Sequence, residues 1–253
     1  MPIDHEIDSR NKNIQIYING SFYHRDEAKI SVYDSGFLMG DGIWEGLRLV
    51  NNKWIFIDEH IDRLFEGCKA IDLDIKMTKE DIVNALDETK AINNMSNEVH
   101  ARLMITRGNK SKPFQQPHLS ESGINIVIIM EHSKPNTDLK NITMATVPQV
   151  RGLPMSQDPK LNSHSKLNCI LACIQANKLG ADEALMLDPL GFVNTTNSCN
   201  FFIVKNNQVW TSTGDYCMNG VTRQNIINLC KENNIPIYEK NFSLVDVYSA
   251  DEA

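Results

Sequence analysis

Short hydrophobic runs separated by turn residues dominate the first 130 residues and predict several strands. Residues 14–18 alternate and precede Asn19-Gly20, a dipeptide typical of a tight β-hairpin turn. Residues 43–50 and 53–57 flank Asn51-Asn52 in the same manner, so we expect them to pair. Further strands are predicted at residues 30–33, 100–108 and 123–130.

Two stretches in the same half have helical periodicity. Asp58 is a suitable N-cap residue, and the apolar positions after it recur every three or four residues. These positions are Ile61, Leu64, Phe65, Cys68 and Ile71. Arg63 lies beside this face, where it either points towards the interior or pairs with Glu59 one turn earlier. A second helix is predicted from about residue 79 to residue 92.

The second half of the chain centres on one lysine. Lys166 follows the polar segment of residues 162–165 and precedes a predicted helix, which Gly180 ends. The expected core face of that helix is Leu167, Ile170, Leu171 and Ile174, with the smaller Ala172, Cys173 and Ala176 between them. The other predicted elements are strands at residues 143–147, 184–188, 201–204, 208–211 and 235–239, and a helix from Thr222.

The order of these elements predicts two unequal domains of α+β class, with mainly antiparallel sheets and flanking helices. We assign residues 1–131 to a smaller N-terminal α/β domain and residues 142–253 to a C-terminal domain. The polar residues 132–141 are the expected linker between them. No internal repeat or heptad pattern suggests another architecture.

Charge and cysteine content narrow the class of protein. The 25 Lys and Arg residues against 32 Asp and Glu give a net charge of −7, which argues against nucleic acid as a partner. No apolar run approaches the roughly 20 residues that span a bilayer, and the polar N-terminus is unlike a signal peptide. The six cysteines show no zinc-ligand spacing, so we expect reduced thiols, no metal and a cytoplasmic location.

Three kinds of feature could bind an aldehyde or an anion. Lys166 is a candidate nucleophilic amine, since burial would lower its pKa, although a solvated surface lysine is the alternative. Gly220, Val221 and Thr222 form a glycine-led helix N-terminus suited to a phosphate, although Thr222 could be a plain N-cap. Three arginines offer planar forks for phosphate or carboxylate: Arg63, Arg102 and Arg107. A lysine together with phosphate-binding elements suggests pyridoxal phosphate.

These motifs, in this order, resemble those of a known family. The segments ISVYDSGFLMGDGIWEGLRLV and FIDEHIDRL, then ADEALMLDPLGFV, NSCNFFIV and NGVTRQNI, are similar to the class IV pyridoxal-phosphate aminotransferases. The family includes branched-chain aminotransferase, D-amino-acid aminotransferase and aminodeoxychorismate lyase. The resemblance covers essentially the whole chain from about residue 14. It implies the two-domain fold-type IV architecture, pyridoxal 5'-phosphate as the cofactor and a homodimer.

The resemblance also implies which residues hold the cofactor. Lys166, directly before Leu167-Asn168, would be the catalytic Schiff-base lysine, and it would move the proton of the substrate α-carbon. Lys160, which also precedes a Leu-Asn pair, is the alternative. The cofactor phosphate would be held by Arg63, Gly220, Val221 and Thr222.

A different group of residues would contact the substrate. Its carboxylate would bind Arg102, as in branched-chain enzymes, or Arg107, as in D-amino-acid enzymes, and the sequence leaves both open. Phe37, Met39 and Trp44 would line an apolar side-chain pocket, although they are equally natural as core residues. These residues favour a branched-chain-like apolar substrate.

Two positions depart from the family pattern. The glutamate that faces the pyridine nitrogen in the family is Thr195 here, and a neutral hydroxyl stabilises a carbanion less than a carboxylate does. The family continues into a Thr-Gly-Thr turn, whereas this sequence stops at Ala253, so we expect either a truncated chain or a phosphate site that lacks one wall.

The expected reaction is transamination between an amino acid and a 2-oxo acid. The alternatives are an elimination like that of aminodeoxychorismate lyase, transamination of D-amino acids, or a cofactor-binding homologue with poor catalysis. Thr195 and the C-terminus at Ala253 motivate the last of these.

Overall fold

The computed structural model describes residues 8–134 and 142–253, and its internal contacts divide them into two units. Residues 8–134 together with 162–165 form the first unit. Residues 142–161 and 166–253 form the second. Most of the expected linker, residues 135–141, lies outside the described residues, as do residues 1–7. The predicted domain boundaries therefore stay predictions.

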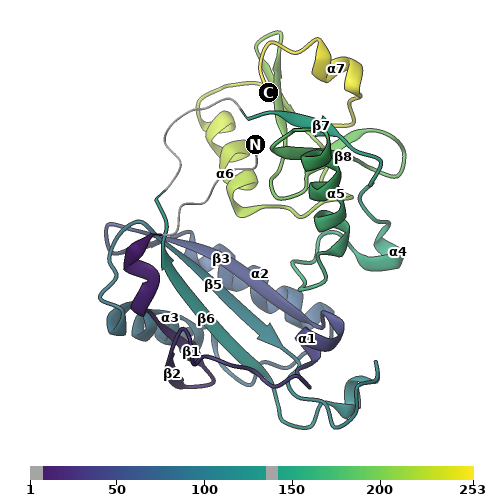
Figure 1. Cartoon of the computed structure of the whole chain (residues 1–253). Coiled ribbons are helices and arrows are strands. Elements are labelled where there is room, and N and C mark those ends of the chain that lie inside the picture. Colours follow the sequence, from purple (N-terminus) through teal and green to yellow (C-terminus); the bar gives the residue numbers. More distant parts are fainter. Residues whose placement is uncertain (1–7, 135–141) are drawn as a thin grey trace. The chain divides into compact units, whose positions relative to one another are not determined.

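The first unit contains a sheet that has six strands among its described residues, in the order β2-β1-β6-β5-β3-β4 (Figure 1). All neighbouring strands are antiparallel. The strands are β1 (Gln15–Ile18), β2 (Ser21–His24), β3 (Gly42–Val50), β4 (Lys53–Ile55), β5 (Val99–Thr106) and β6 (Asn125–His132). Asn19 and Gly20 both have positive φ, as the tight turn between β1 and β2 requires.

One predicted strand of this unit is wrong. Residues 30–33 form a loop and a turn, and Ile30 and Val32 are exposed. The β-rich local sequence pairs with no neighbouring strand among the described residues, and propensity alone does not make a strand. The chain then enters the short helix α1 (Ser35–Met39), whose first turn is capped by the Asp34 carboxylate.

Two helices, α2 (Ile57–Ala70) and α3 (Lys79–Ile92), cover one face of this sheet (Figure 1). Strand residues that face them are fully buried, such as Leu47 on β3 and Leu103 on β5, and Leu64 of α2 joins the same core. Their strand neighbours, which point to the other face, are half-buried. Short 3-10 helices lie at η1 (Ser9–Asn13) and η2 (Pro117–Leu119).

The second unit is built on smaller sheets, which have three strands each among its described residues. In one sheet β7 (Met144–Thr146) pairs in parallel with β8 (Glu183–Leu187), which pairs antiparallel with β9 (Val193–Thr196). In the other, β10 (Phe202–Lys205) is antiparallel to β11 (Gln208–Thr211), which is parallel to β12 (Ile237–Glu239). Parallel pairs were not anticipated in this half. The helices are α4 (Pro154–Gln157), α5 (Leu167–Lys178), α6 (Val221–Glu232) and α7 (Leu244–Tyr248).

The buried face of α5 differs from the predicted one. Ala172 and Ala176 are fully buried against β7 and β8, whereas the large apolar residues lie outside the core of this unit. The exposed residues are Leu167, Ile170, Leu171 and Ile174. Small side chains allow the helix backbone to approach the sheet closely, and the larger residues then form an exposed apolar stripe on the other side. We call these four residues the α5 stripe.

Candidate functional site

Glu45 is a fully buried carboxylate that joins β3 to α2 in the first unit. Arg63 donates from Nε to Oε1 at 2.8 Å and from Nη2 to Oε2 at 2.6 Å. Nδ1 of His60 lies 2.7 Å from the same Oε2. A carboxylate removed from water requires such partners, because an unpaired buried charge is costly. Arg63 therefore points towards the sheet, and Glu45 holds its guanidinium in one orientation.

The opposite face of the same sheet carries the half-buried guanidinium of Arg102 on β5. Its Cζ lies 4.0 Å from the centroid of the Trp44 ring on β3, which is a cation–π contact. Burial lowers the pKa of Arg102. Arg102 makes no hydrogen bond or ion pair through its side chain with any residue that the structure describes. A half-buried guanidinium in this state can receive a carboxylate.

His100 and Arg48 lie opposite each other on β5 and β3, one step along the same face from Arg102. Burial, together with the charges of Arg48 and Arg102, lowers the pKa of His100 from 6.5 to about 4. His100 is therefore neutral near pH 7, and the face gains positive potential from the two arginines. Arg48 also donates from Nη1 to the Ser133 carbonyl at 2.7 Å.

The polar segment that precedes Lys166 extends the edge of β3. Ser163 forms an antiparallel bridge with Ile43, and the backbone N–H of Trp44 donates to the Asn162 carbonyl at 3.0 Å. Asn162 Nδ2 donates to the Trp44 carbonyl at 2.6 Å, and the Trp44 indole donates to the Ser163 carbonyl at 3.2 Å. These bonds fix the ring on which Arg102 lies.

Arg107 is engaged almost completely inside the first unit. Its Nε and Nη2 donate to the two carboxylate oxygens of Asp41 at 2.8 and 3.1 Å. Nη1 and Nη2 donate to the carbonyls of Asp72 and Ile71 at 2.8 and 2.7 Å. Arg107 therefore ties the end of β5 to the start of β3 and to the end of α2. Little donor capacity remains for a substrate carboxylate, so the geometry favours Arg102 over Arg107 for that role.

The expected apolar pocket residues differ in exposure. Phe37 on α1 is 68% exposed, so it is not a core residue of the first unit. Met39 and Trp44 are half-buried. An exposed phenylalanine is available for a ligand or another chain.

Both candidate lysines belong to the second unit. Lys166 is the residue before the first turn of α5 and is half-buried, with backbone angles outside the helical region (φ −109°, ψ 11°). Lys160 is exposed in the turn that follows Asp158, whose carboxylate accepts from the Lys160 backbone N–H at 2.9 Å. Partial burial fits a functional amine better than full exposure does, but the choice between the two stays a prediction.

The N-terminus of α6 starts at Gly220, and no side chain of the described residues caps it. The backbone N–H groups of Val221 and Thr222 lie in the first turn, where they have no intrahelical acceptor. The Asn200 side chain lies so close to Gly220 that a Cβ at this position would overlap with it. Asn200 is itself held by a 3.0 Å hydrogen bond to the Met218 carbonyl. An uncapped helix start of this kind favours a phosphate.

Thr195 on β9 is 5% exposed, and its hydroxyl proton is already donated in a hydrogen bond. Its Oγ1 donates to the Cys199 carbonyl at 2.5 Å, and the Thr196 hydroxyl approaches the same carbonyl at 3.2 Å. Only lone pairs of Thr195 are left for any further group, so it can accept a hydrogen bond but carries no charge. Its neighbour Asn194 has a buried Oδ1 that finds no hydrogen-bond partner within the described part of the chain.

Several residues of these clusters escaped the sequence reasoning. One signal could have pointed to Glu45, because it is a charged residue at a buried position of β3. No comparable signal marks His60 or His100. Arg223 is 3% exposed, and its Nη2 donates to the Ser212 carbonyl at 2.7 Å and to Glu239 at 2.8 Å, which fixes α6 to the sheet of β11 and β12.

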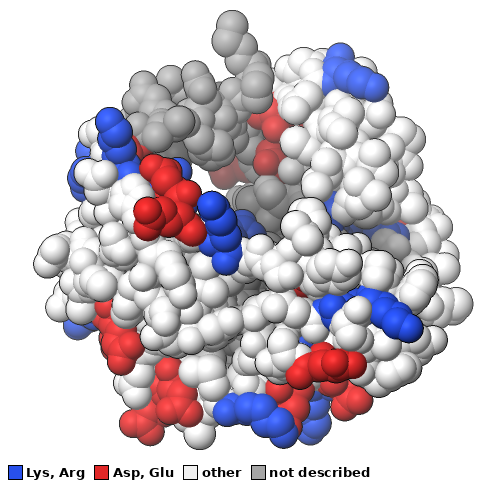
Figure 2. Space-filling model, turned by 60° about the horizontal axis from the view of Figure 1, so that its bottom comes forward, with Lys and Arg blue, Asp and Glu red and all other residues white. Residues whose placement is uncertain are grey.

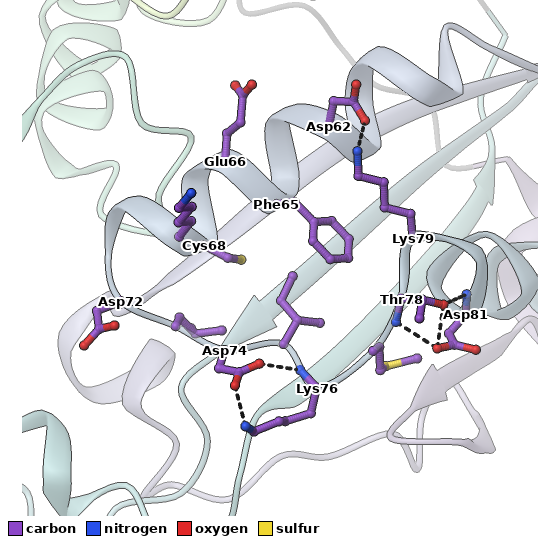
Figure 3. Close-up of a pocket in the computed structure, with 14 residues that line it drawn as sticks. Asp62, Phe65, Glu66, Cys68, Asp72, Asp74, Lys76, Thr78, Lys79 and Asp81 are labelled. Atoms are coloured by element: carbon purple, nitrogen blue, oxygen red, sulfur yellow. Dashed lines mark hydrogen bonds and ion pairs between the residues drawn. The ribbon is translucent and has the colours of Figure 1, made fainter.

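A hollow of about 720 Å³ lies in the first unit between α2, the loop after it and the start of α3 (Figure 3). Apolar side chains such as Phe65 contribute to its wall, and the ion pair of Lys79 with Asp62 lies at its rim (Figure 3). Cys68 is also there, and burial raises its thiol pKa to about 12. None of the residues predicted for the site lines this hollow.

Acidic and basic side chains are scattered among neutral ones on the face shown in Figure 2. Within residues 8–134 and 142–253 no cluster of three or more His, Cys, Asp or Glu side chains is arranged to hold a metal ion. No helix in the described part of the chain is both long and apolar enough to cross a membrane.

Comparison with known proteins decides the family. Residues 42–253 match the family model of amino-transferase class IV. This chain belongs to the class IV aminotransferases. The resemblance inferred from the motifs is thereby confirmed, and the cofactor of this family is pyridoxal 5'-phosphate.

Similar proteins carry two kinds of name. A putative branched-chain-amino-acid aminotransferase of Methanocaldococcus jannaschii is 37% identical, over 94% of this chain and 82% of its own length. A D-alanine aminotransferase of Listeria monocytogenes is 32% identical over the same shares. Branched-chain-amino-acid aminotransferase-like protein 2 of Arabidopsis thaliana is 35% identical over 96% of this chain, which spans only 44% of that protein.

Solved structures confirm the predicted α+β fold. The branched-chain aminotransferase of Thermoproteus uzoniensis, solved with norvaline, matches with a TM-score of 0.86 and 25% identity over 94% of this chain and 82% of that one. The branched-chain amino acid aminotransferase of Thermobaculum terrenum, solved in its PLP form, matches with a TM-score of 0.84 at 19% identity, over 95% and 81% of the two chains. At that identity the second match speaks for the fold alone.

Proposed function

We propose that this chain binds pyridoxal 5'-phosphate and transfers an amino group between an amino acid and a 2-oxo acid. The observation that carries the proposal is the uncapped, glycine-led N-terminus of α6 in a class IV aminotransferase chain. A Cβ at Gly220 would overlap with Oδ1 of Asn200, so a larger residue would require that side chain to move, and the uncapped N–H groups after Gly220 suit a phosphate. Val221, Thr222 and the guanidinium of Arg63 supply the donors that hold the phosphate.

The chemistry is divided between the cofactor and the chain. When bound, the cofactor supplies an aldehyde that takes up the amino group and a ring that withdraws electrons from the substrate α-carbon. Lys166 would hold the cofactor through Nζ, and the same amine would accept the proton that leaves the substrate α-carbon. Its half-buried position before α5 supports this role, with Lys160 as the alternative.

Arg102 binds the substrate carboxylate in this proposal. Its lack of a side-chain partner among the described residues supports this assignment, and so does the commitment of Arg107 to Asp41 and two carbonyls. Trp44, Met39 and the exposed Phe37 contact an apolar side chain, which favours a branched-chain-like substrate. The D-alanine aminotransferases among the relatives keep D-amino acids as the alternative.

The enzyme works as a homodimer in the cytoplasm. The α5 stripe supports association, because four large apolar residues at helical spacing are exposed on one helix. All six cysteines are free thiols, as is usual for proteins of a reducing compartment.

One observation favours a second candidate, a homologue that binds the cofactor but catalyses poorly. Thr195 would face the ring nitrogen, and its proton is committed to the Cys199 carbonyl at 2.5 Å. A neutral acceptor does not hold a proton on a pyridine nitrogen as a carboxylate does. The electron-withdrawing power of the ring is then lower, and the rate of α-proton loss falls.

A single labelling experiment tests both candidates. Purified protein is mixed with pyridoxal 5'-phosphate, its absorption spectrum is recorded, and borohydride reduction is followed by peptide mapping. Label on Lys166, lost in Lys166→Arg but kept in Lys160→Arg, supports the proposed function, and label on Lys160 transfers the role to that residue. Label on Lys166 with little amino transfer to a 2-oxo acid supports the second candidate, and reversible binding without a labelled lysine contradicts attachment through either lysine. A protein that binds no cofactor contradicts both.

The substrate is identified with the same preparation. Amino transfer to 2-oxoglutarate is measured with leucine, valine and D-alanine as donors. With aminodeoxychorismate as the substrate, release of pyruvate without amino transfer would instead indicate the elimination reaction of a lyase.

A further inference from the structure

We propose that Glu45 is the positioning residue that aims Arg63 at the cofactor phosphate. This inference rests on the proposed function, because it takes Arg63 as a phosphate ligand. Glu45 itself does not touch the cofactor in this proposal. It acts through the guanidinium of Arg63, with which it shares two hydrogen bonds of 2.8 and 2.6 Å.

The geometry of the pair fixes a direction. A guanidinium is planar, and its Nε and Nη2 form one edge that matches a carboxylate. Glu45 occupies that edge with both oxygens, so the plane and the axis of the Arg63 group are set. The second edge of a guanidinium, formed by Nη1 and Nη2, then points in a defined direction before any ligand arrives. Preorganised donors bind an anion more tightly than mobile ones, since less freedom is lost on binding.

The burial of Glu45 favours this arrangement. Glu45 is 0% exposed, so its carboxylate depends on Arg63 and His60, and not on bulk water, for hydrogen bonds. The Oε2 atom accepts from Nη2 of Arg63 and lies 2.7 Å from Nδ1 of His60, and both partners come from the same side of α2. The loss of either partner would leave a buried charge short of hydrogen bonds. The hydrogen bonds between Glu45 and Arg63 are therefore kept in the protein without cofactor.

The charge of the cluster supports positioning rather than simple attraction. The carboxylate of Glu45 offsets the positive charge of Arg63 at 2.6 Å. If net charge alone mattered for a phosphate, a buried carboxylate next to its arginine would be unfavourable. The presence of Glu45 is accounted for if the direction in which the guanidinium presents its second edge matters more than the net charge.

A purely structural role is the competing explanation, since Glu45 also links β3 to α2. The two explanations differ in one measurable ratio. A structural link affects pyridoxal 5'-phosphate and unphosphorylated pyridoxal alike, whereas a positioning role for a phosphate ligand affects only the phosphorylated form.

The test compares both ligands in the unsubstituted chain and in Glu45→Gln, which keeps the size of the side chain but removes its charge. Dissociation constants for pyridoxal 5'-phosphate and pyridoxal are measured by absorption and equilibrium dialysis. We expect Glu45→Gln to weaken binding of the phosphorylated form about tenfold or more. Pyridoxal should change less than about twofold, since it has no phosphate for Arg63 to hold. Inorganic phosphate should also compete less well with the cofactor in the variant.

Matched controls keep the result interpretable. Glu66→Gln makes the same chemical change on the exposed side of α2 and should leave both constants unchanged. If Glu45→Gln does not fold by circular dichroism, Glu45→Asp keeps the charge but shortens the side chain, and the same loss is expected. An equal effect on both ligands would overturn the inference and leave the proposed function intact. An unsubstituted chain that shows no preference for the phosphorylated form would overturn the proposed function itself.

Discussion

The guanidinium carbon of Arg102 lies 4.0 Å from the centroid of the Trp44 ring, on the sheet face opposite α2 and α3. Because the Arg102 side chain has no hydrogen-bond or ion-pair partner among the described residues, we expect it to bind the carboxylate of a substrate. Arg102→Met should raise KM for the 2-oxo acid about tenfold or more, with a smaller change in kcat. Arg48→Met is the control, since it removes a neighbouring charge from the same face and should change KM less. An unchanged KM in Arg102→Met would refute the assignment.

We expect Arg107 to stabilise the folded chain and not to bind the substrate. It holds Asp41 and the carbonyls of Ile71 and Asp72, and its side chain is only 16% exposed. Arg107→Met should lower the free energy of unfolding by about 1–2 kcal/mol, because it removes charge-assisted hydrogen bonds to partly buried acceptors. Urea denaturation measures this loss. Asp41→Asn should cost less when added to Arg107→Met than in the unsubstituted chain. A stable Arg107→Met with a large rise in KM would restore the carboxylate role to Arg107.

His100 should make the stability of the chain depend on pH. Its pKa falls from 6.5 to about 4 on folding, so the unfolded chain binds more protons between these values. Stability contributed by neutral His100 is therefore complete above pH 6.5 and is lost as the pH falls towards 4. The loss should be about 2–3 kcal/mol, after allowance for partial solvent screening. His100→Gln should flatten the pH dependence of the urea midpoint. The exposed His118, changed to Gln, should not.

Thr195→Glu tests the position of the ring nitrogen. A glutamate at this 5% exposed site would bury an unpaired carboxylate in the free protein, which should cost about 2–4 kcal/mol. Bound cofactor should restore most of this stability, because its ring nitrogen can carry a proton opposite the carboxylate. Melting temperatures with and without the cofactor measure the difference. Thr196→Glu, at an equally buried neighbouring position, should lose stability without recovery. If both variants recover equally, Thr195 does not face the ring.

The α5 stripe predicts the oligomeric state. Ile170→Glu and Leu171→Glu place a charge on a surface that we expect a second copy to cover, so light scattering should show a shift from dimer to monomer. Gln175→Glu adds the same charge on α5 at a residue outside the stripe and should leave the dimer intact. Monomeric unsubstituted protein would contradict the expectation that a second copy covers the stripe.

The strands of the first unit could be predicted because their alternation is strong and their turns carry asparagine and glycine. Periodicity was less informative for α5. It located the helix but assigned the wrong face, because apolar spacing does not reveal that Ala172 and Ala176 pack closest to the sheet. At residues 30–33 a strand was predicted where none forms. The local sequence is typical of a strand, but the segment pairs with no other strand among the described residues.

The candidate site was only partly accessible from the sequence. The helix start at Gly220 could be found because a glycine and a hydroxyl at a helix start are a local pattern. The partnership of Glu45 with Arg63 could not, because 18 residues separate the two and only the sheet brings them together. The hydrogen bonds of Arg107 to Asp41 could not be predicted for the same reason, since the two residues are 66 positions apart.

Arg107 connects the hollow of Figure 3 to the start of β3. Asp72 lines that hollow. Arg107 donates hydrogen bonds to the carbonyls of Asp72 and Ile71, and it also pairs with Asp41, which precedes β3. A displacement of the loop after α2 would therefore pull on the first residues of β3, where Trp44 lies. Changes to this outlying loop belong among the first to examine when variants with altered substrate preference are sought.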